Sequence, residues 1–259
     1  MKIKIFIARM LTISLIGKIL SYFYNDKIPF RGMVFNTSIP EISPATKAEL
    51  FWKIYESAEI RFIQKYLPES FDVIELGSSI GVVSSLIRKR LYKNACLICV
   101  EAHPALSRHI PVNLNLNRLY HNVECLNMAI NYNKKSNNNV FFTPGHLSTT
   151  GRLTCGNPQH NSIMVKAVTL FELKSAYHIN DFVLIADIEG EEVYIIRQDR
   201  EALRDCQHIF FELHNTTYAG VPVSVDDMLK ELIDIHGFYL QDRHDNVVYL
   251  NRNTGTIAK

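Results

Sequence analysis

The stretch Phe71-Asp72-Val73-Ile74-Glu75-Leu76-Gly77-Ser78-Ser79-Ile80-Gly81-Val82-Val83-Ser84 predicts a strand, a tight loop and a helix. The apolar run 73–76 is typical of a buried strand, and the two glycines allow a sharp turn that a ligand can approach closely. After Gly81 the apolar residues follow a helical period, and basic residues at 88–90 suit the negative end of a helix. The amino end of that helix offers free N–H groups to an anionic group. The stretch therefore predicts a ligand-binding loop.

The spacing of the glycines indicates which ligand. A dinucleotide-binding loop needs Gly-x-Gly-x-x-Gly, but three residues separate Gly77 from Gly81 here and the third glycine is absent. The pattern Glu-x-Gly-x-x-x-Gly, with Glu75 at the strand end, suits a ligand that carries an amine, a carboxylate and a ribose. S-adenosylmethionine (SAM) is such a ligand. Glu101 ends the next apolar run, 97–100, where its carboxylate can accept hydrogen bonds from both ribose hydroxyls.

Later strands supply further candidates at the same edge of the sheet. A third strand over 123–127 places Asn127 and Met128 beside the adenine of a ligand held by the first two strands. The continuous apolar run 182–186 predicts a fourth parallel strand that ends at Asp187. The residues expected to contact the cofactor are Glu75, Gly77, Ser79, Gly81, Glu101, Ala102, Asn127, Met128 and Asp187.

The catalytic residues are expected to be Asp187, Glu189 and His214. Carboxylates at a buried strand end are costly because desolvation opposes their charge. His214 ends a fifth strand and shares a face with Glu212; we favour it as the general base, since an ordinary pKa of about 6.5 lets it accept a proton at neutral pH. A histidine satisfied at a strand end, and a divalent metal at the cluster, are the alternatives. With one histidine in the cluster, proton transfer is preferred and no metal is predicted.

Composition bounds the class of protein. The chain has 259 residues, 47% hydrophobic and 21% charged, which is typical of a globular α/β protein. The formal charge is only +2, so the composition does not indicate a nucleic-acid-binding protein. The five cysteines are scattered and odd in number, so we interpret them as buried free thiols in a reducing compartment, and expect a cytoplasmic protein.

The first 24 residues are apolar but contain four basic side chains. Only eight uncharged residues lie between Arg9 and Lys18, whereas a spanning helix needs about 20 mostly apolar residues. Two interpretations remain: a helix that packs on the domain or on a partner, and a basic amphipathic segment that lies peripherally on an anionic membrane. Residues 26–44 read as an extended linker or a lid, so the predicted division is 1–43 for the N-terminal segment and linker, and 44–259 for the main domain.

The rest of the chain alternates between strands and helices. A helix is expected over 45–67, and Pro111 is expected to kink or split a helix over 105–119. Residues 131–161 hold a single short apolar run, so we expect a long substrate loop there. The chain ends in an antiparallel hairpin, 238–250. We therefore predict an α/β, Rossmann-like fold with a mostly parallel seven-stranded sheet, one reversed strand and helices on both faces.

The chain resembles the FkbM family of SAM-dependent methyltransferases over roughly residues 55–250. The matching segments are Tyr55-Glu56 with Glu59, 73–81, Val100-Glu101-Ala102-His103-Pro104, Asp187-Ile188-Glu189-Gly190-Glu191-Glu192 and Phe211-Glu212-Leu213-His214. The resemblance implies a class I methyltransferase fold and O-methylation of a sugar, glycan or natural-product hydroxyl. Glu75 stands where Asp is commoner in the family, and Ile185 stands where a lysine is often found.

Three functions compete at this point. The first is a SAM-dependent O-methyltransferase that acts on a small-molecule or glycan hydroxyl and not on nucleic acid. The second is a nucleotide-dependent oxidoreductase, which the absent third glycine disfavours. The third is a non-catalytic methyltransferase-like module held at a membrane surface by residues 1–24, which the combined presence of Glu75, Gly77, Gly81, Glu101 and Asp187 disfavours.

Overall fold

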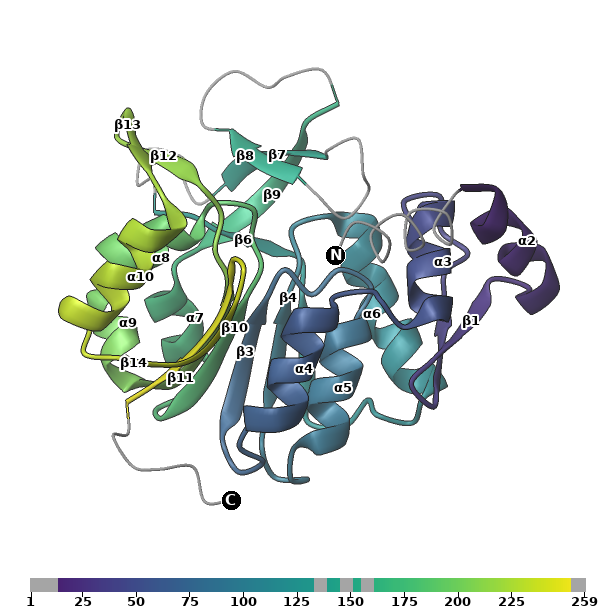
Figure 1. Cartoon of the computed structure of the whole chain (residues 1–259), viewed down its shortest axis with the longest axis horizontal. Helices are drawn as coiled ribbons and strands as arrows, with labels where there is room; N and C mark the ends of the chain where they lie inside the picture. The colour runs from purple at the N-terminus through teal and green to yellow at the C-terminus, as the bar shows by residue number, and fades with distance from the viewer. Residues whose placement is uncertain (1–13, 133–138, 145–150, 155–160, 253–259) are drawn as a thin grey trace.

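A seven-stranded sheet forms the centre of the molecule (Figure 1). The computed structural model describes residues 14–132, 139–144, 151–154 and 161–252. Across the sheet the strands are β14 (Tyr239–His244), β15 (Val247–Asn251), β11 (Cys206–Glu212), β10 (Phe182–Ala186), β3 (Asp72–Leu76), β4 (Leu97–Val100) and β5 (Val123–Leu126). Strand β15 is antiparallel to both its neighbours, and the other pairs are parallel. The predicted fold class, including the terminal antiparallel hairpin, is confirmed.

Helices cover both faces of this sheet (Figure 1). On one face lie α4 (Ser57–Tyr66), α5 (Val82–Arg90) and α6 (Pro104–Leu116); on the other lie α7 (Leu170–Ala176), α8 (Glu192–Gln198), α9 (Arg200–Asp205) and α10 (Val225–Asp234). Successive residues of a strand point to opposite faces. In β10, Val183 and Ile185 enter the core under α4 to α6, whereas Leu184 and Ala186 enter the core under α7 to α10. This explains why the sequence of β10 is continuously apolar.

The chain order of the strands reverses beside β3. From β3 the chain moves outward to β4 and β5, and later returns to place β10 on the other flank of β3. In open parallel sheets, ligands bind outside the carboxyl ends of the strands at such a switch point. The loop after β3 and the loop after β10 meet here, since the backbone N–H of Asp187 donates to the carbonyl of Leu76 over 3.0 Å.

A second sheet includes two strands from the segment 131–161, for which a substrate loop was predicted. Its order is β6-β9-β7-β8, with β6 Met128–Ile130, β9 Ile163–Val168, β7 Asn139–Pro144 and β8 Gly151–Thr154. It lies beyond the carboxyl ends of the central strands (Figure 1). The expectation of one short strand was therefore wrong: Val140 and Phe142 alternate inward and pack with Val165 in a small core of their own. The rest of the predicted loop lies outside the described residues.

The N-terminal segment packs on the main domain. Helix α2 (Ser14–Tyr24) lies against α3 (Pro44–Trp52), and a β-carbon on Gly17 would fall 1.6 Å from the carbonyl oxygen of Pro44. The predicted linker is wrong, because β1 (Lys27–Phe30) and β2 (Met33–Asn36) form an antiparallel hairpin there. Ile28, Phe30 and Phe35 are fully buried in the same core as the central sheet. The two strands are only four residues each, too short for their hydrophobic pattern to predict the hairpin.

Two helix predictions also need correction. The single helix expected over 45–67 is broken, because Lys53 and Glu56 adopt left-handed backbone angles (φ 62° and 41°) between α3 and α4. Pro111 does not split α6, which continues from 104 to 116 with Ile110 and Leu114 buried on either side of the proline. Packing of those two side chains holds the helix together across the hydrogen bond that proline cannot make.

Candidate active site

A pocket of about 750 Å³ opens at the carboxyl ends of β3, β4, β10 and β11. Of the residues predicted from the sequence, nine line it: Glu75, Gly77, Ser79, Glu101, Ala102, Met128, Asp187, Glu189 and His214. Gly81 and Asn127 do not line it. A volume of this size lies within the range of small-molecule and cofactor sites, about 300–1,000 Å³. Parallel strand ends thus bring together side chains that lie up to 139 positions apart in the chain, as Glu75 and His214 do.

The two glycines of the loop after β3 have different structural roles. Gly77 has φ +88°, and a β-carbon there would lie 1.9 Å from the carbonyl oxygen of Asp187, so the loops after β3 and β10 touch backbone to backbone. Gly81 has φ +81° and caps the amino end of α5, where a β-carbon would lie 3.0 Å from the side chain of Ile110. Gly77 therefore shapes the pocket wall, whereas Gly81 shapes the loop behind it.

Glu101 lies at the end of β4 with both carboxylate oxygens held by the backbone. Oε2 accepts a hydrogen bond from the N–H of Ser79 over 2.8 Å, and Oε1 accepts one from the N–H of His103 over 2.7 Å. Burial raises the pKa of this carboxyl to about 7, and the two backbone hydrogen bonds oppose the shift. The result is a carboxylate fixed in orientation at the pocket wall, with lone pairs left for a hydroxyl donor.

Two neighbouring residues support this end of the pocket. Glu75 is buried and accepts a hydrogen bond from the hydroxyl of Ser84 over 2.5 Å, while burial raises its pKa. The side-chain amide of Asn127 donates to the carbonyls of Glu101 and Ala102, each over 2.9 Å. Asn127 was predicted to contact the cofactor; in the structure it instead ties the end of β4 in place.

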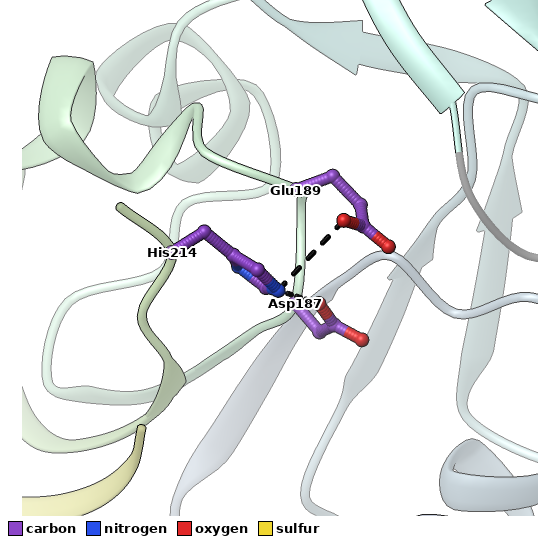
Figure 2. A group of neighbouring side chains, drawn as sticks. All are labelled: Asp187, Glu189 and His214. Atoms are coloured by element: carbon purple, nitrogen blue, oxygen red, sulfur yellow. Dashed lines mark ion pairs between the residues drawn. The ribbon is translucent and has the colours of Figure 1, made fainter. Parts of the chain in front are cut away.

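The predicted catalytic residues lie together on the opposite side. Figure 2 shows the imidazole of His214 facing the carboxylates of Asp187 and Glu189. His214 Nε2 lies 3.8 Å from Asp187 Oδ1, from Glu189 Oε2 and from an oxygen of Glu212. These distances are longer than a hydrogen bond. Among the described residues, Asp187 Oδ1 has no hydrogen-bond partner although the atom is buried from solvent.

The other ring nitrogen of His214 has a defined partner. Nδ1 lies 3.4 Å from Oε1 of Glu192, a carboxylate with no exposed surface. Glu192 is itself fixed, because its two oxygens accept the N–H groups of Ile188 and Gly190, each over 2.9 Å. Glu192 was not predicted as a site residue. The signal was present in the sequence: Glu192 follows Ile188 by four residues and Gly190 by two, at the start of α8, where its carboxylate can reach back to the backbone amides of the preceding turn.

The charges of this cluster depend on one another. Burial lowers the pKa of His214, but the hydrogen bond with Glu192 and the charges of Asp187 and Glu189 outweigh burial and raise the pKa to about 9. Burial and the charge of Glu212 raise the pKa of Asp187 well above its ordinary value. The imidazole of the free protein is thus protonated at neutral pH, unlike the ordinary histidine assumed from the sequence.

Three elements of the pocket wall were missed or left undecided. Tyr55, Glu56 and Glu59 all line it, from α4 and the turn before it. The hairpin of β12 (Thr216–Tyr218) and β13 (Val221–Val223) forms another part and was not predicted. Its signal in the sequence is Ala219-Gly220 between Tyr218 and Val221, two residue types common in strands. Both turn residues have positive φ, which is typical of a two-residue hairpin turn. Phe142 of the second sheet closes a third side.

Backbone strain gathers at this pocket. Glu56, Ser79 and Glu189 line it with φ of +41°, +48° and +55°. Non-glycine residues held in this region cost about 1–3 kcal/mol each and cluster at functional sites. Three separate loops carry the strain, which indicates that the surrounding fold fixes the pocket wall in a geometry that the loops alone would not choose.

Two other predictions bear on the setting of the site. Within the part of the chain that the structure describes, no helix is long and apolar enough to cross a membrane. The cysteines described, Cys96, Cys99, Cys125 and Cys206, are all free thiols, but only Cys99 and Cys206 are buried as predicted; Cys155 lies outside the described residues. Burial raises the pKa of Cys206 to about 12, so this thiol is inert.

The strand order and the pocket at its switch point define a Rossmann-like protein with the sheet of the class I methyltransferases. A family model described as the methyltransferase FkbM domain matches residues 75–240, more than half of the chain. The chain therefore belongs to the FkbM methyltransferase family, and the predicted resemblance is confirmed.

Comparison with known proteins adds distant likenesses of fold. No curated protein matches the chain. A putative transferase from Pyrococcus horikoshii is 11% identical with a TM-score of 0.48, covering 92% of this chain and 80% of that one. A putative rRNA methylase from Clostridium thermocellum is 8% identical with a TM-score of 0.46, covering 75% and 92%. Fibrillarin from Aeropyrum pernix, solved with natively bound S-adenosyl-L-methionine, is 15% identical with a TM-score of 0.41, covering 76% and 73%.

Proposed function

We propose that this protein transfers a methyl group from SAM to a hydroxyl oxygen of a sugar, glycan or natural product. One observation supports this above all: a single pocket holds an oriented carboxylate at the end of β4 and, across from it, a cluster of carboxylates around an imidazole. The first is suited to a ribose and the second to a hydroxyl that must lose its proton. A methyltransferase needs both within reach of one another.

The residues of the donor side fit the cofactor. Glu101 presents fixed lone pairs to two ribose hydroxyls, and Met128 and Val100 add apolar wall where a flat base can pack. Gly77 leaves room at the loop for the amino-acid part because no β-carbon is present. When bound, SAM supplies an electrophilic methyl group on a sulfonium. The protein's part is to align that group with the acceptor and to exclude competing water.

The residues of the acceptor side fit a hydroxyl. Asp187, Glu189 and His214 face one space at the mouth of β10 and β11. We propose that this trio orients the acceptor hydroxyl and that one of its groups accepts the proton that the hydroxyl releases as the methyl group is transferred. None of the described residues that line the pocket is lysine or arginine. A pocket so rich in carboxylates favours neutral or cationic acceptors and disfavours phosphorylated ones, nucleic acid included.

The cofactor can be tested by calorimetry with SAM and S-adenosylhomocysteine. We expect wild-type protein to bind both, and Glu101→Gln to bind at least tenfold more weakly because the fixed ribose contact is charge-assisted, at about 1.5–3 kcal/mol. Glu124→Gln is the matched control, since Glu124 is an exposed acid on the next strand, β5, outside the pocket. Well-folded wild-type protein that binds neither compound would refute the proposal and leave the non-catalytic module.

The oxidoreductase alternative has its own test. The loop after β3 holds two glycines where a dinucleotide needs three. NAD or NADP should therefore give no thermal stabilisation under conditions where S-adenosylhomocysteine does. A larger shift with either dinucleotide would reverse the assignment.

We also propose that α2 rests on an anionic membrane surface. Its inner residues Gly17 and Leu20 pack on the domain, yet its outer face is apolar too: the exposed side chains are Leu15 (63%), Ile19 (45%), Tyr22 (84%) and Phe23 (77%). Lys18 is exposed among them. Aromatic and aliphatic side chains beside a lysine suit the boundary between acyl chains and anionic headgroups.

Vesicle sedimentation tests this surface. Full-length protein should pellet with phosphatidylserine vesicles and less with neutral phosphatidylcholine vesicles, and Tyr22→Ser with Phe23→Ser should reduce pelleting. Tyr92→Ser is the control, because Tyr92 is an exposed aromatic (55%) away from α2. Equal pelleting of the double variant and the control would refute the proposed contact.

A further inference from the structure

We propose that Asp187, Glu189 and His214 bind a divalent metal cation of the Mn²⁺ type. The three residues come from the ends of β10 and β11, and one ligand atom from each lies within 4.8 Å of the others. Both carboxylates and the imidazole turn toward the same space, as Figure 2 shows. A site of this composition would add a second charged component to the pocket, independent of the cofactor.

The distances fit ligands of one ion better than partners of each other. His214 Nε2 lies 3.8 Å from Asp187 Oδ1 and 3.8 Å from Glu189 Oε2, so neither pair makes a hydrogen bond. Ligands of a divalent ion sit about 2.0–2.2 Å from it, which leaves two ligand atoms as far as roughly 4 Å apart. The gap between these atoms is thus of the size that an ion fills.

The orientation of the imidazole supports the same conclusion. Glu192 Oε1 is an acceptor, so the hydrogen bond over 3.4 Å places a proton on Nδ1. In the neutral ring this leaves the lone pair on Nε2, which faces Asp187 and Glu189. Glu192 is fixed in turn by the amides of Ile188 and Gly190. A histidine that donates one ring N–H to a carboxylate while the other nitrogen faces outward is the usual support for a metal ligand.

One carboxylate oxygen of the cluster lacks a hydrogen-bond donor among the described residues. Asp187 Oδ1 is buried from solvent and has no hydrogen-bond partner among the described residues. Glu212 adds a further oxygen 3.8 Å from Nε2, and Glu56, Asp187 and Glu212 form a second group of close oxygens. Carboxylate oxygens that face one another in a half-buried cluster repel, and this is costly without a positive charge between them. A bound cation removes that cost.

The donor set indicates the kind of ion. Carboxylate oxygens suit Mg²⁺, Ca²⁺ and Mn²⁺, while an imidazole nitrogen favours first-row transition metals. Mn²⁺ satisfies both preferences, and three protein ligands leave positions open to another molecule. On the proposed methyl transfer, that molecule would be the acceptor, whose hydroxyl a cation makes more acidic. This role of the cation rests on the proposed function, whereas the cation site itself does not. In this role the cation, and not His214, would promote loss of the acceptor proton.

The test is a titration of the protein with MnCl₂ alone. Binding is measured by electron paramagnetic resonance as the loss of the signal of free Mn²⁺. Wild-type protein should bind one equivalent. Asp187→Asn, Glu189→Gln and His214→Ala should each weaken binding by about tenfold or more, since even outer-sphere partners of metal sites contribute 10–100-fold. Glu191→Gln is the matched control, because Glu191 lies in the same loop and lines the pocket but belongs to neither close group of ligand atoms.

Two readouts separate this inference from the proposed function. Circular dichroism must show each variant folded, and Glu189→Gln is the mildest because Glu189 is the most exposed of the three side chains. Glu101→Gln should keep Mn²⁺ binding while losing SAM. Wild-type protein that binds SAM but no Mn²⁺, or ligand variants that bind Mn²⁺ as tightly as Glu191→Gln, would overturn the cation site and leave methyl transfer standing.

Discussion

The two sides of the pocket differ in how their charges are satisfied. On the side of β3 and β4, Glu75 accepts from the hydroxyl of Ser84, and both oxygens of Glu101 accept backbone amides. On the side of β10 and β11, three carboxylate oxygens stand 3.8 Å from one ring nitrogen, and Asp187 Oδ1 is buried without a hydrogen-bond partner among the described residues.

This difference indicates which side is complete without a ligand. Fixed dipoles around Glu101 hold it in one geometry before anything binds, which is the arrangement that gives affinity without reorganisation. In the cluster around His214, Glu192 fixes the ring from behind and the side-chain amide of Asn246 donates to Glu212 over 3.1 Å, but Asp187 Oδ1 has no such partner among the described residues. Its charges are balanced only by protonation or by a positively charged ligand. The donor side is preorganised by the chain, and the acceptor side is completed by what binds to it.

The largest effect is expected from Gly77→Ala, which disrupts the backbone contact between the loops after β3 and β10. The new β-carbon would lie 1.9 Å from the carbonyl of Asp187, in a backbone with φ +88°. Left-handed strain of about 1–2 kcal/mol adds to an overpacking cost of about 1–3 kcal/mol, so urea denaturation should show a loss of several kcal/mol. SAM binding should be lost with it.

Gly220→Ala provides the control for that measurement. Gly220 has a similar φ of +82°, but no atom lies within 4 Å of a β-carbon placed there. It should show the strain alone, about 1 kcal/mol. Equal losses in the two variants would mean that the loops after β3 and β10 do not press on each other.

A smaller effect is expected from the ionisation of Glu101. Burial raises its folded pKa to about 7, above its ordinary value of 4.5, so between these values the folded state holds a proton that the unfolded state has released. Wild-type stability should therefore fall as pH rises from about 5 to 8. Glu101→Gln removes this loss, and at pH 8 it should be more stable than wild type by at most about 3 kcal/mol, at 1.4 kcal/mol per pKa unit.

The affinity for SAM should increase with pH over the range in which stability decreases. The ionised carboxylate is the better acceptor for ribose hydroxyls, so wild-type SAM affinity should decrease as pH falls below about 7. Calorimetry and urea denaturation at pH 5, 6, 7 and 8 measure both trends. A wild-type protein whose stability relative to Glu101→Gln does not change with pH would show that this carboxyl is not desolvated.

The sequence predicted the parts of this site that local rules govern. Gly77, Glu101 and Asp187 follow apolar runs, and parallel strands deliver their ends to one edge, so their convergence could be expected. The second sheet could not, because β7 and β8 are short and flank segments with no periodic pattern. The pKa of His214 could not be predicted either, because it depends on how closely Glu192, Asp187 and Glu189 approach the ring, and the turn after β10 decides those distances.

Asn127 shows that a correctly predicted strand end leaves the direction of a side chain open. It was placed beside the cofactor because it follows the third strand, but its amide bonds the carbonyls of Glu101 and Ala102 and keeps it off the pocket wall. Strand position fixes where a residue stands along the sheet edge. The direction of its side chain depends on which backbone groups nearby need a donor.

The smallest effect comes from removing that support. Asn127→Ala should weaken SAM binding by roughly fivefold, since a lost hydrogen bond contributes about 1 kcal/mol and the carboxylate of Glu101 would lose part of its fixed orientation. Asn122→Ala is the control, because its amide likewise donates to carbonyls, those of residues 93–95, at the opposite end of β4. Both variants should lose similar stability, but only Asn127→Ala should lose affinity in calorimetry. If both weaken SAM equally, the donor side is not preorganised by this bond, and the contrast between the two sides of the pocket rests on the backbone amides of Ser79 and His103 alone.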